Sequence, residues 1–300
     1  MKRIRIFFLF CIICISFLCS CSDKKGKHIA SFKIYTSFYP VYEITKYVVG
    51  DKAEVSLLMN STDVHSYEPS SKDMAELYSS KVFIYHSESF ETWVDPLKKN
   101  FKEEKVHLIE GVEKNKLNKV KGLEEFDSSK NIYDPHTWLD PILVGEEAIT
   151  IGKKLSEIDK QNKSYYLEKS EQFNKKMKMI EKKYQTIFKK KKQKYFVTQH
   201  TAFSYLAKRF GLQQLGIAGI SNELEPNSRQ MAEIELFIKE NNVKVIFTET
   251  NSSPKIANSL RDSTGVSLKV LSPLENKPNN NKTFIENFEE NLSTLDKNMQ

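Results

Sequence analysis

Cysteine is nearly absent from this 300-residue chain, because all four of its cysteines lie within the first 21 residues. The rest of the chain can therefore form neither an internal disulfide nor a thiolate metal site. The short local ligand spacings of zinc fingers and of the His-Glu-x-x-His helix are also missing. Any metal site must be assembled from histidine and carboxylate side chains that are distant in the sequence.

Long apolar runs are scarce, and the one at residues 6–18 follows a short basic stretch. This layout is typical of a secretory signal, and the run is too short for a mature transmembrane helix. The run ends in Leu-Cys-Ser-Cys at residues 18–21, which resembles the lipobox of bacterial lipoproteins. We therefore predict a lipoprotein signal peptide at 1–20, a lipid (palmitate) on Cys21 and a flexible, lysine-containing tether at 21–32. An ordinary cleaved signal is the alternative.

A strong charge of one sign is lacking as well. The formal net charge falls from +7 to +4 when the three basic residues of the predicted signal are removed. Apart from Lys189–Lys192 the lysines are dispersed, and no arginine and aromatic platform accompanies them, so the composition does not indicate a nucleic-acid partner. The cluster Lys189–Lys192 is typical of a helix C-terminus, where cations offset the backbone dipole.

About 280 mature residues exceed what one core usually supports, which favours two domains.

An internal repeat supports that division. Three segments recur in the same order roughly 160 residues later: 33–50 as 194–211, 68–77 as 225–234, and 81–85 as 244–248. Each copy has the pattern strand, helix, loop, helix, strand, and its strands are rich in β-branched residues, as in buried parallel sheets. The sequence therefore predicts an α/β fold with two pseudo-symmetric parallel-sheet lobes.

A long amphipathic helix is predicted between the two copies. Apolar residues recur at spacings of mainly three and four through the lysine- and glutamate-rich residues 160–191. At ~1.5 Å per residue, such a helix would reach ~48 Å, which is long enough to join two lobes. We predict an N-terminal lobe at 33–159, a linking helix at 160–191 and a C-terminal lobe at 192–300, in a monomer. A coiled-coil dimer arm is the alternative, but the apolar stripe is irregular.

Three histidines are candidate metal ligands. His65, His136 and His200 each lie in a short segment rich in aromatic or turn residues. Histidines in loops at strand ends can point into a shared cleft, and ligands of open α/β sheets bind outside the carboxyl ends of the strands. A site between the lobes would take His65 and His136 from the first lobe and His200 from the second. Spacing alone leaves open whether the three meet.

The segments around these histidines resemble the metal-binding lipoproteins that serve bacterial ABC importers of zinc and manganese. The resemblance runs from Lys33 to the C-terminus and is closest to the zinc-specific members of Gram-positive bacteria. It rests on Tyr67-Glu68-Pro69 after His65, Trp138-Leu139-Asp140-Pro141 after His136, Ala202-Phe203 after His200, and the late run Val270-Leu271-Ser272-Pro273-Leu274-Glu275. It implies two α/β lobes joined by a long rigid helix, a buried metal between them, and Glu275 as the fourth ligand.

The resemblance also favours zinc, because the manganese branch has a carboxylate where His200 stands. Three imidazoles and one carboxylate suit tetrahedral zinc, whereas manganese prefers more oxygen ligands. Glu249 remains a rival for the fourth ligand, since it follows the last strand of the second copy at the position that His86 takes in the first. The alternative for Glu249 is a hydrogen bond to a ligand histidine.

The resemblance implies a receptor that is not an enzyme. It would be lipid-anchored at the extracellular face of the cell membrane, capture Zn²⁺, and deliver it to an ABC permease and its ATPase. Alternatives are a manganese-specific receptor of the same family, a secreted zinc hydrolase with an open metal position, and a surface adhesin.

Overall fold

The computed structural model describes residues 32–59, 64–101, 106–119, 133–221, 226–250 and 253–299. The predicted signal peptide, most of the tether and Cys21 lie outside the described residues. Residues Phe32–Gln300 form one compact unit. Among the described helices, none combines the length and the apolar composition that a membrane span requires.

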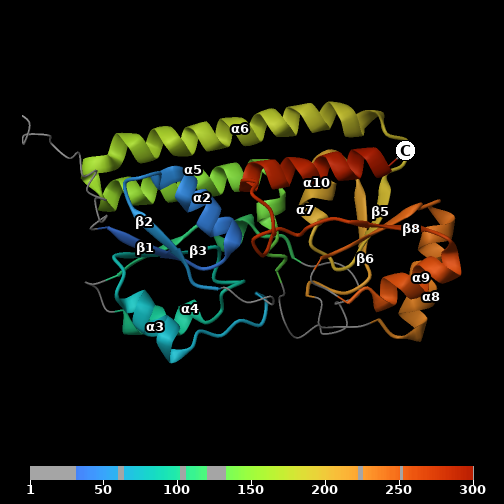
Figure 1. Cartoon of the computed structure of the whole chain (residues 1–300), viewed down its shortest axis with the longest axis horizontal. Helices are drawn as coiled ribbons and strands as arrows, with labels where there is room; N and C mark the ends of the chain where they lie inside the picture. The colour runs from blue at the N-terminus through green and yellow to red at the C-terminus, as the bar shows by residue number, and fades with distance from the viewer. Residues whose placement is uncertain are drawn as a thin grey trace, which may run out of the picture. The chain divides into compact units, whose positions relative to one another are not determined.

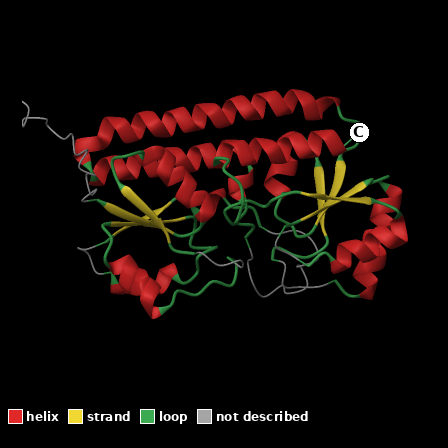
Figure 2. Ribbon diagram, viewed as in Figure 1, coloured by secondary structure: helices red, strands yellow, loops and turns green. Residues whose placement is uncertain are grey.

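Two separate four-stranded parallel sheets form the frame of this unit (Figure 2). The first contains β1 (Lys33–Thr36), β2 (Glu54–Leu57), β3 (Val82–Tyr85) and β4 (His107–Glu110) in the order β2-β1-β3-β4. The second contains β5 (Tyr195–Thr198), β6 (Gln213–Gly216), β7 (Val245–Thr248) and β8 (Ser267–Val270) in the order β6-β5-β7-β8. The strand order is the same in both sheets, so the predicted fold class of two pseudo-symmetric parallel-sheet lobes is confirmed.

The central strands are buried on both faces, as their composition requires. All four residues of β3 and of β7 are buried. The sequences of such strands are largely apolar, because helices cover both sides of a parallel sheet. The helices are α2 (Tyr39–Val49), α3 (Ser71–Tyr78), α4 (Val94–Asn100), α5 (Pro141–Ile158), α6 (Lys163–Lys190), α7 (Ser204–Phe210), α8 (Ser228–Glu240), α9 (Lys255–Thr264) and α10 (Phe284–Asn298).

Local sequence sets several helix ends. Helix α3 begins at a capping box in which Ser70 and Asp73 bond each other's backbone amide groups, and α8 begins at the equivalent box of Asn227 and Gln230. Helix α7 ends at Gly211, whose φ of +66° is the left-handed conformation that favours glycine. The two copies of the repeat therefore share their helix starts as well as their strands.

Helix α6 lies along one side of the unit (Figure 1) and contacts helices of both lobes. It packs against α5 and α2 of the first lobe and against α7 and α10 of the second. Its buried stripe consists of Tyr166, Ser170, Phe173, Asn174, Met177, Ile180, Tyr184 and Phe188. The approach to α5 needs small residues, since a Cβ on Gly152 would lie 2.5 Å from Ser170 Oγ. One apolar cluster runs from Ile34 in β1 to Phe247 in β7, so the two lobes share a core along α6.

Candidate metal centre

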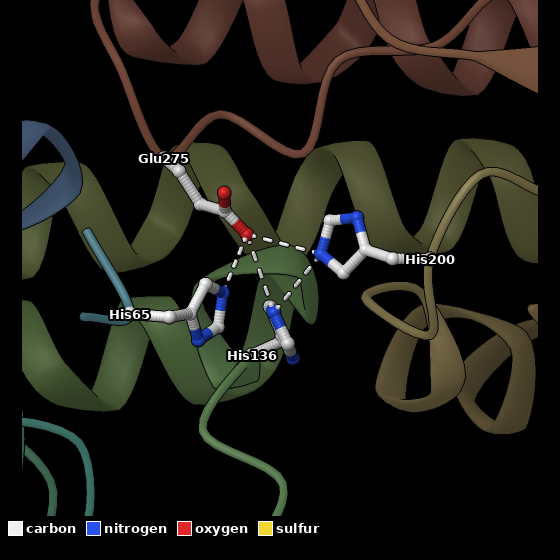
Figure 3. Close-up of side chains that lie close together, drawn as sticks. All are labelled: His65, His136, His200 and Glu275. Atoms are coloured by element: carbon white, nitrogen blue, oxygen red, sulfur yellow. Dashed lines mark hydrogen bonds and ion pairs between the residues drawn. The ribbon is translucent and has the colours of Figure 1, made fainter. Parts of the chain in front are cut away.

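Four side chains from four loops converge between the two sheets (Figure 3). His65 lies in the segment between β2 and α3, and His136 directly precedes the short 3₁₀ helix Thr137–Leu139. His200 lies two residues after β5, and Glu275 lies in the loop between β8 and α10. One ligand atom from each of the four lies within 4.8 Å of the other three. The structure therefore brings together all four residues that the sequence analysis favoured.

Four separations between the ligand atoms are close to those of a tetrahedral zinc site. Oε1 of Glu275 lies 3.2 Å from Nε2 of His65, 3.3 Å from Nε2 of His136 and 3.2 Å from Nε2 of His200. The Nε2 atoms of His136 and His200 are 3.4 Å apart. Zinc–ligand bonds of about 2.0–2.1 Å give a tetrahedron with edges of about 3.3–3.4 Å. These four separations are close to those edges, and the two between His65 and the other histidines are at most 4.8 Å.

The centre is shielded from solvent, and its charges are coupled. His136 and His200 are fully buried, and Glu275 is nearly so. Burial alone would lower the pKa of His200, but the charge of Glu275 and the hydrogen bond to Glu249 outweigh it and raise the pKa to about 10. Burial alone would raise the pKa of Glu275, yet His200 and the other histidines hold it well below its usual value. The carboxylate is therefore ionised and pairs with a protonated His200 in the metal-free protein, so zinc must displace that proton when it binds.

Two further carboxylates orient the buried histidines. Nδ1 of His136 bonds Oδ1 of Asp134 at 2.8 Å, and Nδ1 of His200 bonds Oε1 of Glu249 at 2.5 Å. A carboxylate at Nδ1 fixes the ring and leaves Nε2 free to bind a metal. Glu249 thus contacts the outer nitrogen of His200 and is not part of the four-residue group. Asp134 gave no signal in the sequence beyond its place two residues before a candidate ligand.

Asp134 also connects the two lobes. Its side chain accepts a hydrogen bond from Ser204 Oγ, and its backbone oxygen accepts one from the Tyr205 hydroxyl at 2.8 Å. Ser204 and Tyr205 begin α7, which follows the His200 loop. The segment that carries His136 is therefore attached to the segment that carries His200.

The loop that carries Glu275 is fixed by hydrogen bonds on both sides. The indole Nε1–H of Trp138 donates to the backbone oxygen of Pro273 at 2.8 Å, across the two lobes. The side chain of Asn291 bonds both the backbone N–H and the backbone oxygen of Ser272, at 3.2 and 2.6 Å. Leu274 is fully buried with φ +55°, a conformation that costs energy in a residue with a side chain. This strained turn directly precedes Glu275 and helps to aim its carboxylate.

A buried His86 supports the His136 segment from the other side. Its Nε2 bonds the backbone oxygen of Pro135 at 2.8 Å, and its Nδ1 bonds Oε1 of Glu147 in α5 at 3.1 Å. Glu91 accepts hydrogen bonds from the backbone N–H groups of His86 and Ser87, both at 2.9 Å. His86 follows β3 as Glu249 follows β7, so the repeat places a supporting group at the same point of each lobe.

Replacement of His86 by glutamine should reduce stability by an amount that depends on pH. Burial alone would lower the pKa of His86, but the charge of Glu147 and their hydrogen bond raise it above its ordinary value. A raised folded-state pKa contributes stability that is fully present below about pH 6.5 and is lost as the pH rises through the folded value. Denaturant unfolding of the metal-free proteins should show a deficit in the variant that shrinks as pH increases. A deficit that grows with pH would contradict the ion pair.

Comparison with known proteins yields one consistent group. Residues 34–298 match the family model described as zinc-uptake complex component A, periplasmic. The high-affinity zinc uptake system protein ZnuA of Bacillus subtilis (strain 168) is 35% identical in an alignment of 306 positions that covers 94% of this chain and 93% of ZnuA. The zinc-binding lipoprotein AdcA of Streptococcus pneumoniae is 35% identical over all of this chain, which spans only 60% of AdcA.

Solved structures give the same picture. The crystal structure of AdcAII of Streptococcus pneumoniae is 51% identical, with a TM-score of 0.83 over 89% of this chain and 98% of that chain. A Zn(II)-bound mutant variant of AdcAII gives a TM-score of 0.84 at 50% identity, over 90% and 99% of the two chains. The laminin-binding protein Lmb of Streptococcus agalactiae, described as having adhesin and metal-transporting activity, gives 0.83 at 46% identity, over 90% and 100%.

Proposed function

The chain belongs to the family of periplasmic zinc-uptake components A, and we propose that it holds zinc through His65, His136, His200 and Glu275. Its function is to capture Zn²⁺ for uptake through an ABC importer, whose permease and ATPase are the partners this role implies. It is a solute-binding protein and not an enzyme. The manganese, hydrolase and adhesin alternatives are not favoured by these family relations.

The match between ligand spacing and zinc geometry is the observation that carries the ligand assignment. Three nitrogen atoms surround one carboxylate oxygen at separations close to tetrahedral edges. Three neutral imidazoles and one carboxylate are a donor set that zinc accepts readily and manganese less so. Glu249 then serves to orient His200.

The fourth ligand can be tested by comparing Glu275→Gln with Glu249→Gln. We expect one tightly held zinc per chain in the parent protein, with manganese bound much more weakly. Glu275→Gln should weaken zinc and alter the d–d absorption bands of the cobalt(II)-loaded protein, because the coordinating atom changes. Glu249→Gln should cost about tenfold to a hundredfold in zinc affinity, the usual effect of losing an orienting carboxylate, and leave those bands in place.

These two variants are matched, since each replaces a nearly buried carboxylate by its amide in contact with His200. Competitive titration against a chelator gives the affinities, and the cobalt spectrum reports the ligands. A changed spectrum in Glu249→Gln, with no change in Glu275→Gln, would reverse the assignment. A preference of the parent for manganese would contradict the zinc function itself.

Membrane attachment is a separate proposal that rests on the Leu-Cys-Ser-Cys sequence at residues 18–21. We expect Cys21 to carry a lipid that holds the protein, as a monomer, at the extracellular face of the cell membrane. The lobes 33–159 and 192–300, joined by the helix 160–191, would then extend from a tether at 21–32. A related protein, AdcA of Streptococcus pneumoniae, is named a lipoprotein.

Cells given labelled palmitate should incorporate the label into the parent protein but not into Cys21→Ser, which should be released into the medium. Cys19→Ser is the matched control and should keep both the label and the membrane location. Label that persists in Cys21→Ser would contradict the proposed anchor.

A further inference from the structure

The outer face of the second half of α6 carries a stripe of lysines. The stripe consists of five exposed residues, Lys175, Lys178, Lys182, Lys189 and Lys190. Their spacings place them on the helix side opposite the buried residues Met177, Tyr184 and Phe188. At about 1.5 Å per residue the stripe is about 22 Å long.

Few acidic residues lie near this lysine stripe, although the exposed Glu171 lies four residues before Lys175 on the same helix. None of its five lysines forms an ion pair with another described residue, whereas Lys183 and Lys191 beside it pair with Glu289 and Asp296 of α10. From residue 175 to residue 192 the sequence contains a single acidic residue, Glu181. The dipole of α6 explains a preference for cations in the last turn, but not lysines that begin four turns earlier.

An apolar side chain lies within the stripe. Met179 is 64% exposed, the largest exposed fraction among the large apolar residues of the described chain. A helix face that combines several lysines with an exposed apolar residue is suited to an interface between water and lipid. The ammonium groups can reach phosphates while the methylene stems and the methionine contact the acyl boundary.

We propose that the lysine stripe docks on the surface of an anionic phospholipid bilayer. The proposal rests on the membrane attachment proposed above. Each lysine near such a surface contributes on the order of fivefold to binding, so five lysines give a substantial but reversible attraction. The predicted tether at 21–32 would supply an effective concentration in the millimolar range, which turns even weak lipid contacts into stable docking.

Docking through α6 would orient the zinc centre. Helix α6 lies along one side of the unit, and α3, α4, α8 and α9 lie along the other (Figure 1). With the lysine stripe on the bilayer, the side formed by those four helices faces away from the membrane. The protein would then rest parallel to the bilayer while it collects zinc, and transfer would require it to leave this position.

The test uses residues 32–300, which lack the tether and its lysines. This part is expected to fold alone, because it forms one compact unit and solved relatives align over 98–100% of their own length with 89–90% of this chain. Co-sedimentation with vesicles of phosphatidylcholine mixed with phosphatidylglycerol measures binding, and vesicles of phosphatidylcholine alone report the need for anionic lipid. Raising the salt concentration should weaken the binding.

The informative variant changes the five lysines of the stripe to glutamine. Its control changes five exposed lysines elsewhere to glutamine, so that both lose the same net charge: Lys72, Lys239, Lys255, Lys269 and Lys277. We expect the stripe variant to lose at least about tenfold in binding to anionic vesicles and the control less than about threefold. Equal losses in both variants, or no binding by the parent fragment, would overturn the proposal.

Zinc titration of the stripe variant separates this proposal from the zinc function. Unchanged zinc affinity would show that the variant is folded. A loss of vesicle binding would then be due to the loss of the lysine stripe and not to unfolding. If palmitate labelling failed but the stripe still bound anionic vesicles, the anchor would be wrong and the docking surface would stand.

Discussion

Replacement of His136 by alanine should lower the zinc affinity of this protein by more than about a hundredfold. Zinc sites with four protein ligands have apparent binding free energies of about 10–16 kcal/mol, so that one ligand accounts for about 3 kcal/mol or more. His136 is fully buried, and its Nε2 lies 3.3 Å from Oε1 of Glu275 and 3.4 Å from Nε2 of His200. Alanine leaves a gap that water can fill only in part, and Asp134 loses its imidazole partner.

His107→Ala is the matched control, because His107 is an exposed histidine at the start of β4, outside the four-residue group. Its zinc affinity should equal that of the parent. The measurement must be affinity and not metal content, since Zn(II)-bound crystal structures exist for single-residue mutant variants of AdcAII. Competition with a chelator of known strength measures this affinity. If His136→Ala bound zinc as tightly as the parent, the proposed site would be wrong.

The fold was largely predictable because it depends on repeated local patterns. Val82–Tyr85 and Val245–Thr248 are buried strands rich in apolar residues and bounded by helices, and such segments have few alternatives to a buried parallel sheet. The repeat then placed equivalent strands in equivalent positions of two sheets. Helix α6 followed from its apolar spacing over eight turns, a length at which periodicity is a strong signal.

The candidate centre was predictable only as a set of residue types. His65, His136, His200 and Glu275 were favoured by their motifs and by resemblance, whereas the separations that suit zinc emerge only in three dimensions. Among the supporting contacts, only the hydrogen bond of Glu249 to a ligand histidine was considered from the sequence. The Trp138 indole, which the sequence shows only as part of the motif after His136, bonds the loop that carries Glu275.

Two features of the Glu275 loop could not be predicted from the sequence. One is the positive φ of Leu274, and the other is the pair of hydrogen bonds between the Asn291 side chain and the backbone of Ser272. Leucine is not a residue that predicts positive φ, and asparagine within an amphipathic helix reads as a solvent-facing position. Both features hold the loop in the conformation that directs the carboxylate of Glu275 toward the three histidines. Local sequence rules fail where tertiary contacts impose a conformation for function.

The largest effect on stability is expected at Asp140, which performs two tasks with one carboxylate. As the N-cap of α5, its Oδ1 accepts hydrogen bonds from the backbone N–H groups of Ile142 and Leu143, at 2.8 and 3.2 Å. Both carboxylate oxygens also bond Nε of Arg209 in α7, at 3.1 and 3.0 Å. The side chain of Asp140 is 5% exposed and that of Arg209 is 31% exposed, so this link between the lobes is largely shielded from water.

Asp140→Ala should therefore destabilise the metal-free protein by about 3–5 kcal/mol, because it removes a helix cap and leaves a partly buried guanidinium without its partner. Asp140→Asn keeps an oxygen for the cap and should recover about 1 kcal/mol of that loss. Denaturant unfolding gives the values. Lys116→Ala breaks an exposed ion pair with Glu146 of α5 and should cost less than about 1 kcal/mol.

A loss at Asp140 no larger than that at Lys116 would contradict a structural role for the link between the lobes. If the link does have that role, zinc affinity should fall together with stability in Asp140→Ala. Arg209 lies in α7, directly after the loop that positions His200, and Asp140 closes the segment that positions His136. The contact that joins the lobes therefore also sets the distance between two proposed zinc ligands, so stability and metal binding should change together.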